Sequence, residues 1–330
     1  MLIAGIFLIL FTIEYFYFKI ARHFNITDSP NLRSSHAITT IRGGGLIFSI
    51  SVLIYYLVFG WRYPFFAIGL VGLTIISFAD DINHQSRRTR AAIQLLAAIF
   101  LLTETALPIH LLFIWIAALV IITGMLNAYN FMDGINGMTA LYSFSVMIGL
   151  FFVNNAVHAF DEMLLVCLAL SNVVFAYFNC RKTARTFAGD VGSISMAYIL
   201  LFLTTTCIVV TGNPIFLLFF TVYIVDVVFT IIQRLYEKEA IFEAHRKHLF
   251  QYLANELQMP HLTVSAIYLF IQLAITSGII IVWQKSVQIQ WSFAAISIGA
   301  IVISYSIIKF RVLARIRKIK INTTPYFPLQ

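Results

Sequence analysis

Residues 64–90 read PFFAIGLVGLTIISFADDINHQSRRTR, and this stretch decides what kind of fold the chain can have. Its first part is an almost unbroken apolar run, close to the length of a membrane-spanning helix. The run ends on two adjacent aspartates, Asp80 and Asp81, and three arginines follow soon after. The same pattern, an apolar run that borders on polar and charged residues, returns four more times along the chain.

The composition fits a chain that lies mostly in lipid. Hydrophobic residues make up 60% of the 330 residues and charged residues only 11%, with a mean hydropathy of +0.90. A soluble domain usually carries about 25% charged residues, and one large core does not explain the difference. The first twenty residues lack a basic leading end and an A-x-A cleavage site, so we expect them to remain as the first span.

The apolar runs predict an all-α, polytopic integral membrane protein with about eleven transmembrane helices. The runs fall at about 2–21, 43–60, 64–79, 91–107, 111–126, 138–153, 160–178, 192–210, 215–233, 261–282 and 292–309. We find no linker, low-complexity run or convincing repeat, so a single domain is expected over 1–330. Cys167, Cys180 and Cys207 lack C-x-x-C spacing and are expected to be packing residues.

The basic residues predict the orientation in the membrane. With the N-terminus outside and the C-terminus cytoplasmic, all of the 22 Lys and Arg residues except Arg62 and Lys285 lie nearer the inner face. The inner loops are then about 22–42, 80–90, 127–137, 179–191 and 234–260, with a basic tail at 310–330. This tail either rests on anionic headgroups or serves only as a topology anchor.

The polar clusters all fall on this predicted cytoplasmic face. A transporter is expected to carry polar groups near the midplane of the bilayer, within its helices. Clusters at one face instead favour an enzyme that joins a cytosolic substrate to a molecule held in the membrane. The alternative is a non-enzymatic transporter or lipid flippase that uses the same carboxylates.

Asp80 and Asp81 are the first candidate catalytic residues. Adjacent carboxylates repel each other and point about 100° apart on a helix, which suits a site that handles a divalent cation or a proton. The arginines that follow, Arg88 among them, would supply positive charge for phosphates. The alternative is a hydrated helix end.

The stretch 127–137, NAYNFMDGING, places Asn127, Asn130 and Asp133 on one side of a helix end. Its glycines allow a sharp turn and a close approach to a ligand. Simple capping is the alternative, but helix C-termini prefer glycine and basic residues, so three acceptor-rich side chains favour a binding role.

The stretch 187–193, FAGDVGS, opens another apolar run. Asp190 is a carboxylate on a glycine-flanked turn, suited to holding Mg²⁺ against a diphosphate, and the helix amides nearby would bind the same anion. Alternatively, Asp190 and Ser193 only cap the helix.

Two further segments carry cationic side chains. His245, Arg246 and His248 form a dense cluster that could clamp a diphosphate. Arg33, His36 and Arg42 precede the triple glycine at 43–45, which indicates either a phosphate-binding segment or close helix packing. Asp226 lies inside an apolar run and is expected to face the protein interior.

Five motifs in this order, DSPNLRSSH…RGGG, FADD, NAYNFMDGING, FAGDVGS and EAHRKHLFQ, resemble the polyprenyl-phosphate N-acetylhexosamine-1-phosphate transferases of glycosyltransferase family 4. The resemblance implies transfer of an N-acetylated amino-sugar 1-phosphate, 6-deoxy sugars included, from a UDP-sugar to undecaprenyl phosphate, with Mg²⁺ and release of UMP. It implies a multi-pass enzyme of the bacterial cytoplasmic (inner) membrane, conceivably a homodimer. EAHRKHLFQ is closer to the O-antigen and capsule-initiating branch than to the peptidoglycan branch.

The resemblance also implies roles for individual residues. Asp190 would be the metal ligand, with Asp133 beside it, and Asp80, with Asp81, would act as base or nucleophile. The loop of His245, Arg246 and His248 would handle the pyrophosphate, with His245 counted among the catalytic residues. Asn127, Asn130 and Asn136 would bind substrate, as would Arg33, His36, Arg42 and Arg88; Asp226 and Arg234 match less specifically.

The sequence departs from the family pattern at two places. Asn136 stands where DGIDG usually has a second aspartate, and Thr39 and Ile41 replace prolines of PTPRGGG. An amide oxygen at position 136 could still accept a hydrogen bond from uracil. If the position instead tunes the charge of the metal, we expect activity to suffer.

Overall fold

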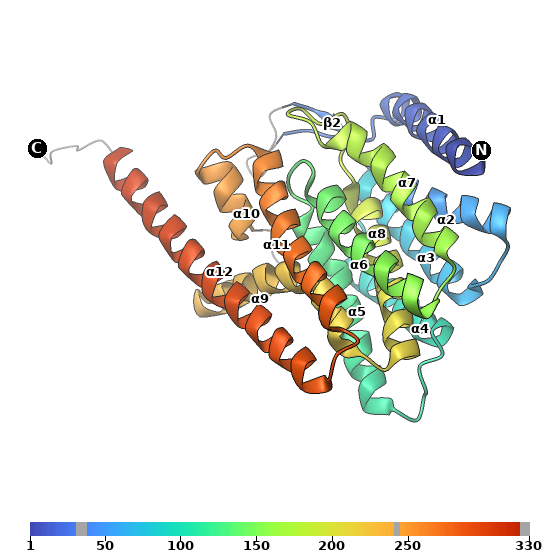
Figure 1. Ribbon diagram of the computed structural model, residues 1–330. Helices are drawn as coiled ribbons and strands as arrows, with labels where there is room; N and C mark the ends of the chain where they lie inside the picture. Colours follow the sequence, from blue (N-terminus) through green and yellow to red (C-terminus); the bar gives the residue numbers. More distant parts are fainter. Residues whose placement is uncertain (31–37, 241–244, 324–330) are drawn as a thin grey trace, which may run out of the picture.

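The computed structural model describes residues 1–30, 38–240 and 245–323, and these ranges are mostly helical (Figure 1). The helices are α1 (Leu2–His23), α2 (Leu46–Phe59), α3 (Pro64–Ile82), α4 (Arg87–Glu104), α5 (Leu112–Met132), α6 (Met138–Val157), α7 (Glu162–Asn179), α8 (Gly189–Thr211), α9 (Thr221–Tyr236), α10 (Leu249–Gln251), α11 (His261–Val282) and α12 (Val287–Thr323). A 3-10 turn, η1 (Pro214–Phe220), precedes α9, and a π-helical turn, η2 (Tyr252–Glu256), follows α10.

Each of the eleven predicted apolar runs coincides with a helical segment, so the predicted all-α, polytopic fold is confirmed. Within the described ranges, nine segments are long and apolar enough to cross a membrane. Of the other two, α2 has only 14 residues, and α4 carries four charged residues among its 18. The ninth run is interrupted, because η1 and α9 form it together. The protein is therefore a multi-pass membrane protein.

Helix α8 lies at the centre of the bundle. It packs against α3, α5, α6 and α2, and it is the most enclosed of the candidate spans. Its residues are apolar on nearly all sides, as expected for a helix surrounded by other helices. Since Asp190 lies in its first turn, the fold places this carboxylate among several neighbouring elements.

The triple glycine allows α2 and α8 to begin in backbone contact. A Cβ atom on Gly45 would collide with the Cα of Gly192, and a Cβ on Gly192 would collide with that of Gly45. The Gly44 amide donates to the Phe187 carbonyl at 3.0 Å, and the Gly45 amide donates to the Ala188 carbonyl at 3.1 Å. Close packing, the alternative interpretation of this motif, is therefore what the structure shows.

Two short strands position the segment just before these glycines. Strands β1 (Thr27–Asp28) and β2 (Thr40–Ile41) pair antiparallel, with Thr27 opposite Ile41. Ile41 also accepts a hydrogen bond from the Phe187 amide at 2.8 Å. These contacts fix Arg42, which directly follows β2, beside the start of α8.

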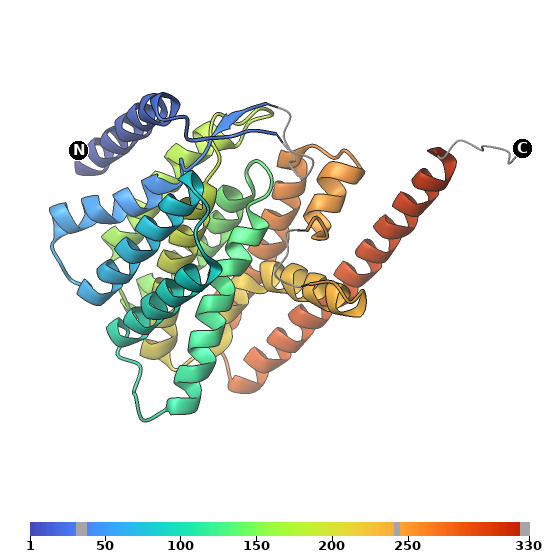
Figure 2. The same cartoon turned by 180° about the vertical axis from the view of Figure 1, so that it is seen from behind.

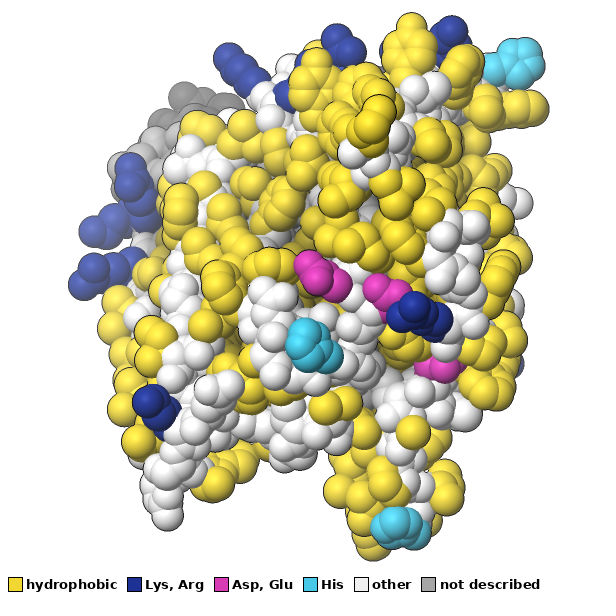
Figure 3. Space-filling view, turned by 45° about the vertical axis from the view of Figure 1, so that its right-hand side comes forward, with side chains coloured by type: hydrophobic (Ala, Val, Ile, Leu, Met, Phe, Trp, Pro, Cys, Tyr) yellow, Lys and Arg dark blue, Asp and Glu magenta, His cyan; other side chains and the backbone are white. Residues whose placement is uncertain are grey.

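Helix α9 leaves the bundle and crosses α12, which is set apart from the other helices (Figures 1 and 2). Helix α12 continues to Thr323, so the predicted basic tail begins as an extension of this helix. Hydrophobic side chains cover most of the face shown in Figure 3, and Lys and Arg gather mainly along its edges. A surface of this kind fits contact with lipid.

Candidate active site

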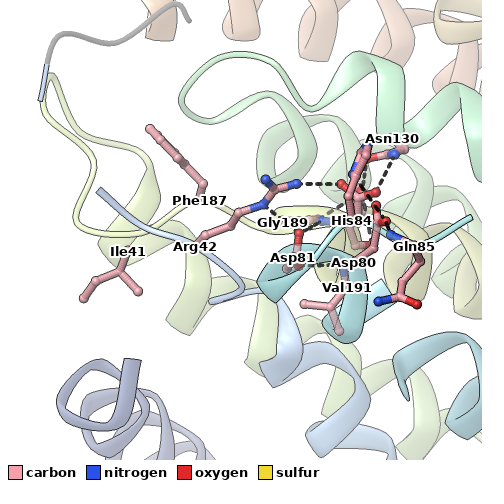
Figure 4. A network of polar contacts seen from close by, with 12 residues as sticks. Ile41, Arg42, Asp80, Asp81, His84, Gln85, Asn130, Phe187, Gly189 and Val191 are labelled. Atoms are coloured by element: carbon pink, nitrogen blue, oxygen red, sulfur yellow. Dashed lines mark hydrogen bonds and ion pairs between the residues drawn. The ribbon is translucent and has the colours of Figure 1, made fainter. Parts of the chain in front are cut away.

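Three aspartates converge where the last turn of α3 meets the first turn of α8 (Figure 4). Arg42 joins two of them, because its Nε donates to Asp81 Oδ1 at 2.7 Å and its Nη2 to Asp190 Oδ1 at 3.0 Å. Arg90, from the first turn of α4, donates from Nη1 to Asp80 Oδ2 at 2.7 Å and to Asp190 Oδ2 at 3.2 Å. Asp190 therefore shares one guanidinium with each of the other two carboxylates.

The two adjacent aspartates have different surroundings. Asp81 caps α8, because its Oδ1 accepts the Asp190 amide at 2.9 Å and its Oδ2 accepts the Val191 amide at 3.1 Å. These are helix amides that we expected to bind a substrate anion, and Asp81 occupies them instead. Asp80 accepts the Gln85 amide at 2.6 Å and caps no helix of its own. Of the two, Asp80 is the better candidate for chemistry.

The arginines are charged and reach the surface of the site. The side chain of Arg42 is 32% exposed and that of Arg90 is 26% exposed. Burial disfavours the charged form of Arg42, but the nearby Asp81 and Asp190 carboxylates outweigh it and raise its pKa. Three carboxylates facing two guanidiniums leave the cluster with excess negative charge when all five groups are ionised.

Asn130 and Asp133 extend this cluster from α5. Asn130 donates from Nδ2 to Asp190 Oδ2 at 3.2 Å, and its Oδ1 accepts the Ser193 hydroxyl at 3.0 Å. Asp133 lies at the end of α5, and its Oδ1 accepts the Thr139 hydroxyl at 2.6 Å. Burial, together with the negative charges of Asp190 and Asp81, raises the pKa of Asp133 to about 7. More positive charge here would favour the ionised form of Asp133.

The donor set suits Mg²⁺ in its chemistry. Among the described residues, no three Asp, Glu, His or Cys side chains are already arranged to hold a metal ion, and arginines lie between the carboxylates. Mg²⁺ prefers oxygen ligands and is commonly bound by one or two carboxylates together with substrate phosphates. Asp190 and Asp133 offer such oxygens, and the excess negative charge of the cluster would be offset by a cation.

Several predicted residues lie outside this cluster. Asn127 donates to Gln94 Oε1 at 2.9 Å and to the Thr123 carbonyl at 2.8 Å. Arg33 and His36 fall outside the described residues.

Arg88, which we expected to bind substrate phosphate, is exposed, and Arg90 is the arginine of this segment that contacts Asp80 and Asp190. The sequence contains a signal that distinguishes Arg90 from Arg88. Ser86 caps α4, and the two arginines lie about 200° apart around that helix, so only one of them can face α3.

The histidine segment lies beside α5 and carries less charge than predicted. The rings of His245 and His248 have centroids 5.0 Å apart, and the centroid of the Phe131 ring lies 6.5 Å from that of His245. Burial, with the nearby His248 and Arg234, lowers the pKa of His245 to about 4. His245 is therefore neutral at pH 7, so the expected cationic cluster lacks this charge.

The protein is expected to lose stability as the pH falls from about 6.5 toward 4, and His245 to cause part of this loss. The unfolded chain binds a proton on this imidazole at a higher pH than the folded chain, so acid favours unfolding. His245→Gln should show a smaller drop in Tm between pH 7 and pH 5 than the wild type does. His110→Gln, in an exposed loop, is the control; equal drops in the wild type and both variants would contradict the assignment.

A cavity of about 810 Å³ is lined in part by residues that lie close in sequence to the aspartates. Its size lies within the usual range for small-molecule sites. The lining includes Asn136, three residues after Asp133, and Phe187, three residues before Asp190. The other polar residues of its lining are Thr40, Arg181, Lys182, Thr183, Arg246, Asn255, Gln258 and His261. A cavity with three cationic side chains suits a phosphate-bearing ligand.

The structure explains why an amide is accommodated at position 136. Asn136 is buried, and its Nδ2 donates to the Arg181 carbonyl at 2.8 Å and to the Lys182 carbonyl at 3.3 Å. The backbone carbonyl of Asn136 accepts the Ser265 hydroxyl at 2.8 Å. A carboxylate has no hydrogen to donate to these carbonyls. Asn136 thus fastens the loop between α7 and α8 to α11.

Asn136→Asp is expected to destabilise the protein by about 1–3 kcal/mol, because a carboxylate would face two carbonyl oxygens without a hydrogen bond. Thermal unfolding at neutral pH measures the effect. Asn172→Asp is a matched comparison, since Asn172 also donates from its amide to a carbonyl, that of Ala140 at 2.9 Å, away from this loop. An Asn136→Asp protein as stable as the wild type would show that these hydrogen bonds do not hold the loop.

The chain is similar to known proteins over the region that carries the aspartates. Residues 63–208, which contain Asp80, Asp81, Asp133 and Asp190, match the family model described as glycosyl transferase family 4. The chain is 27% identical over 287 residues to a probable undecaprenyl-phosphate N-acetylglucosaminyl 1-phosphate transferase of Bacillus subtilis (strain 168), covering 76% of each chain.

Two further relatives are similar. One is an undecaprenyl-phosphate alpha-N-acetylglucosaminyl 1-phosphate transferase of Thermotoga maritima, 27% identical over 253 residues, which cover 72% of this chain and 76% of the relative. The other is a phospho-N-acetylmuramoyl-pentapeptide-transferase of Streptococcus pneumoniae serotype 2, 29% identical over 184 residues, covering 46% and 55%.

The bundle, the converging carboxylates and the match over residues 63–208 together support an integral-membrane glycosyl transferase of family 4. Within that class, the family model and these relatives support the polyprenyl-phosphate N-acetylhexosamine-1-phosphate transferase family.

Proposed function

We propose that the protein transfers an N-acetylated amino-sugar 1-phosphate from a UDP-sugar to undecaprenyl phosphate and releases UMP. The observation that carries this proposal is the convergence of Asp80, Asp81 and Asp190 with Arg42 and Arg90. A basic cavity lined by Asn136 and Phe187, which are close in sequence to Asp133 and Asp190, adds to it. Exchange of one phosphoanhydride for another needs positioning and charge neutralisation more than covalent chemistry. The relatives named above carry the corresponding activity in their names.

The basic cavity is the proposed site of the UDP-sugar. Arg181, Lys182 and Arg246 would face the diphosphate. Phe187 offers an aromatic face to uracil, and the amide oxygen of Asn136 offers an acceptor for its imide hydrogen. In this position uracil lies next to the loop between α7 and α8, and the sugar-bearing phosphate points toward Asp190.

Asp80 is the proposed base. Its carboxylate takes the proton from undecaprenyl phosphate, and the freed phosphate oxygen attacks the β-phosphorus of the UDP-sugar. The bond between that phosphorus and the bridging oxygen breaks, and UMP leaves with the electron pair. Arg42 and Arg90, both part-exposed at the cluster, hold phosphate oxygens and reduce the repulsion between substrates. Mg²⁺, held by Asp190 and Asp133, would neutralise charge on the diphosphate.

The site is proposed to face the cytoplasm, with the N-terminus outside and the basic end of α12 inside. The UDP-sugar is then available on the same face, and the lipid phosphate reaches the site from the inner leaflet of the bacterial inner membrane. We further propose that the reaction starts an O-antigen or capsule-type glycan, on the strength of the EAHRKHLFQ segment. Homodimerisation stays a prediction from the family resemblance.

A transporter or lipid flippase is the second function that the carboxylates could serve. It requires polar groups along a path through the spans. The aspartate–arginine cluster lies where α3 ends and α8 begins, and not midway along these helices. This placement favours the transferase.

A panel of UDP-N-acetyl sugars, offered with undecaprenyl phosphate to the purified protein, tests the proposal. One of these sugars is expected to give UMP and a sugar-diphospholipid, with turnover lost in EDTA and restored by Mg²⁺. Turnover that survives EDTA would refute the need for Mg²⁺. Release of UDP in place of UMP would refute the transfer of a sugar 1-phosphate. N-acetylglucosamine and its 6-deoxy and epimeric relatives make up the panel, so the same assay identifies the sugar.

A further inference from the structure

Asp226 is the centre of a buried hydrogen-bond network behind the histidine segment. This α9 residue is fully buried, and its Oδ1 accepts the Leu249 amide at 3.2 Å and lies 3.1 Å from His248 Nδ1. Its Oδ2 accepts the Tyr268 hydroxyl of α11 at 2.5 Å. A carboxylate that accepts this many hydrogen bonds is best satisfied in its ionised form.

Helix α12 supplies the rest of the network. Tyr305 donates its hydroxyl to Asp226 Oδ1 at 3.0 Å. Lys309, one turn further along α12 and also buried, donates to the Tyr305 hydroxyl at 3.1 Å and to the Thr230 hydroxyl at 3.2 Å. Thr230 in turn lies 3.3 Å from Asp226 Oδ1. The buried ammonium therefore offsets the buried carboxylate through two hydroxyl groups, as buried charges require.

This network fixes the orientation of the His248 ring. Because Asp226 acts as an acceptor toward its other partners, Nδ1 of His248 must carry the hydrogen between them. The second nitrogen, Nε2, is buried and has no hydrogen-bond partner among the described residues. The ring lies beside His245 and beside Phe131, two residues before Asp133. An unpartnered buried nitrogen is costly, and its place beside the aspartate segment suits contact with a ligand.

We propose that Asp226, Tyr305 and Lys309 are positioning residues that hold His248 with Nε2 directed at a diphosphate oxygen of the bound nucleotide sugar. The identity of that ligand rests on the proposed function. In a protonated imidazole both ring nitrogens are donors, so that Nδ1 donates to Asp226 while Nε2 donates a charge-assisted hydrogen bond as charge develops on the leaving phosphate. Helix α12, otherwise peripheral, thereby supports the active site.

Kinetic measurements test the contribution of the network to the reaction. Asp226→Asn is expected to lower kcat by about 10–100-fold, the usual effect of losing a group that orients another, with a change of less than about threefold in KM for the UDP-sugar. Tyr305→Phe, which removes one oxygen, and Lys309→Met should lower kcat in the same direction. Ser306→Ala and Lys318→Met, exposed on the same helix, should leave kcat unchanged.

A double-mutant cycle separates positioning from a general structural role. In a His248→Ala background, Asp226→Asn and Tyr305→Phe should cost less than about threefold in kcat, because the ring they position is gone. Equal losses in the wild-type and His248→Ala backgrounds would overturn the proposal. So would a loss of kcat in Ser306→Ala as large as that in Tyr305→Phe.

Nitrogen-15 NMR of histidine-labelled protein in lipid nanodiscs tests the orientation without any turnover. The signal that His248→Ala removes should show hydrogen on Nδ1 in the wild type and should change in Asp226→Asn and Tyr305→Phe, but not in Ser306→Ala. A His248 signal with hydrogen on Nε2 alone, or one that Asp226→Asn leaves unchanged, would overturn the proposal. Since no substrate is added, failure of the proposed reaction would not affect this result.

Discussion

Asp190→Asn is expected to lower kcat at least about 1,000-fold while the protein stays folded. Its carboxylate is bound by Arg42, Arg90 and Asn130, so it connects all the groups of the cluster. An amide at this position keeps the shape but removes the negative charge that both guanidiniums and the proposed Mg²⁺ require. The loss should appear in kcat more than in KM for the UDP-sugar, because the uracil of the UDP-sugar is bound elsewhere, in the cavity.

UMP release under saturating substrates, with thermal unfolding in parallel, measures the effect of this variant. Asp161→Asn is a matched control, since Asp161 too is paired with an arginine, Arg62 at 2.9 Å, and it also accepts the Tyr55 hydroxyl at 3.0 Å. Asp161 caps α7 at the end of the bundle that we predict to be outside. A folded Asp190→Asn protein with kcat within tenfold of the wild type would show that the cluster is not the catalytic site.

Asp81→Asn is expected to be both inactive and unstable, with a loss of about 3–5 kcal/mol in the free energy of unfolding. Removing the charge leaves Arg42 without its 2.7 Å partner and turns an NH₂ group toward helix amides that need an acceptor. Asp80→Asn should be inactive too, but it should lose less stability, because Asp80 accepts one backbone amide where Asp81 accepts two amides of α8.

Thermal unfolding of the two variants in the same detergent distinguishes the roles of the adjacent aspartates. The account predicts a clearly lower Tm for Asp81→Asn than for Asp80→Asn, with UMP release lost in both. The reverse order of Tm values would assign the structural role to Asp80 and the chemical role to Asp81. Full activity in Asp80→Asn would remove the proposed base.

The helices could be predicted because lipid imposes a simple rule on the sequence. Each span needs a long apolar run, and all eleven predicted runs are helical in the structure. The break between η1 and α9 was not predicted, because both parts are apolar and the run reads as continuous. The same reasoning located the motifs at the ends of these runs that supply Asp80, Asp190 and Asn130.

The role of each individual residue in those motifs depends on contacts between distant segments. Asp81 caps α8 only because the fold brings residues 81 and 190 together, and neither motif alone indicates this. Arg90 could have been preferred to Arg88 from the cap at Ser86, a signal present in the sequence. Lys309 directly precedes the predicted basic tail, yet it is buried and donates to the Tyr305 hydroxyl. Glu14 is buried in α1, and its place as a lone acidic residue inside an apolar run, the signal used for Asp226, could have predicted this.

A donor labelled with radioactive phosphorus in its β-phosphate tests the central claim most directly. The wild-type protein, undecaprenyl phosphate, Mg²⁺ and the labelled UDP-sugar would be incubated and then extracted with organic solvent. The account predicts that the label enters the lipid fraction as a sugar-diphospholipid, in a one-to-one ratio with UMP, and that Asp190→Asn abolishes this transfer. Label that stays in water as UDP while the sugar alone reaches the lipid would contradict it.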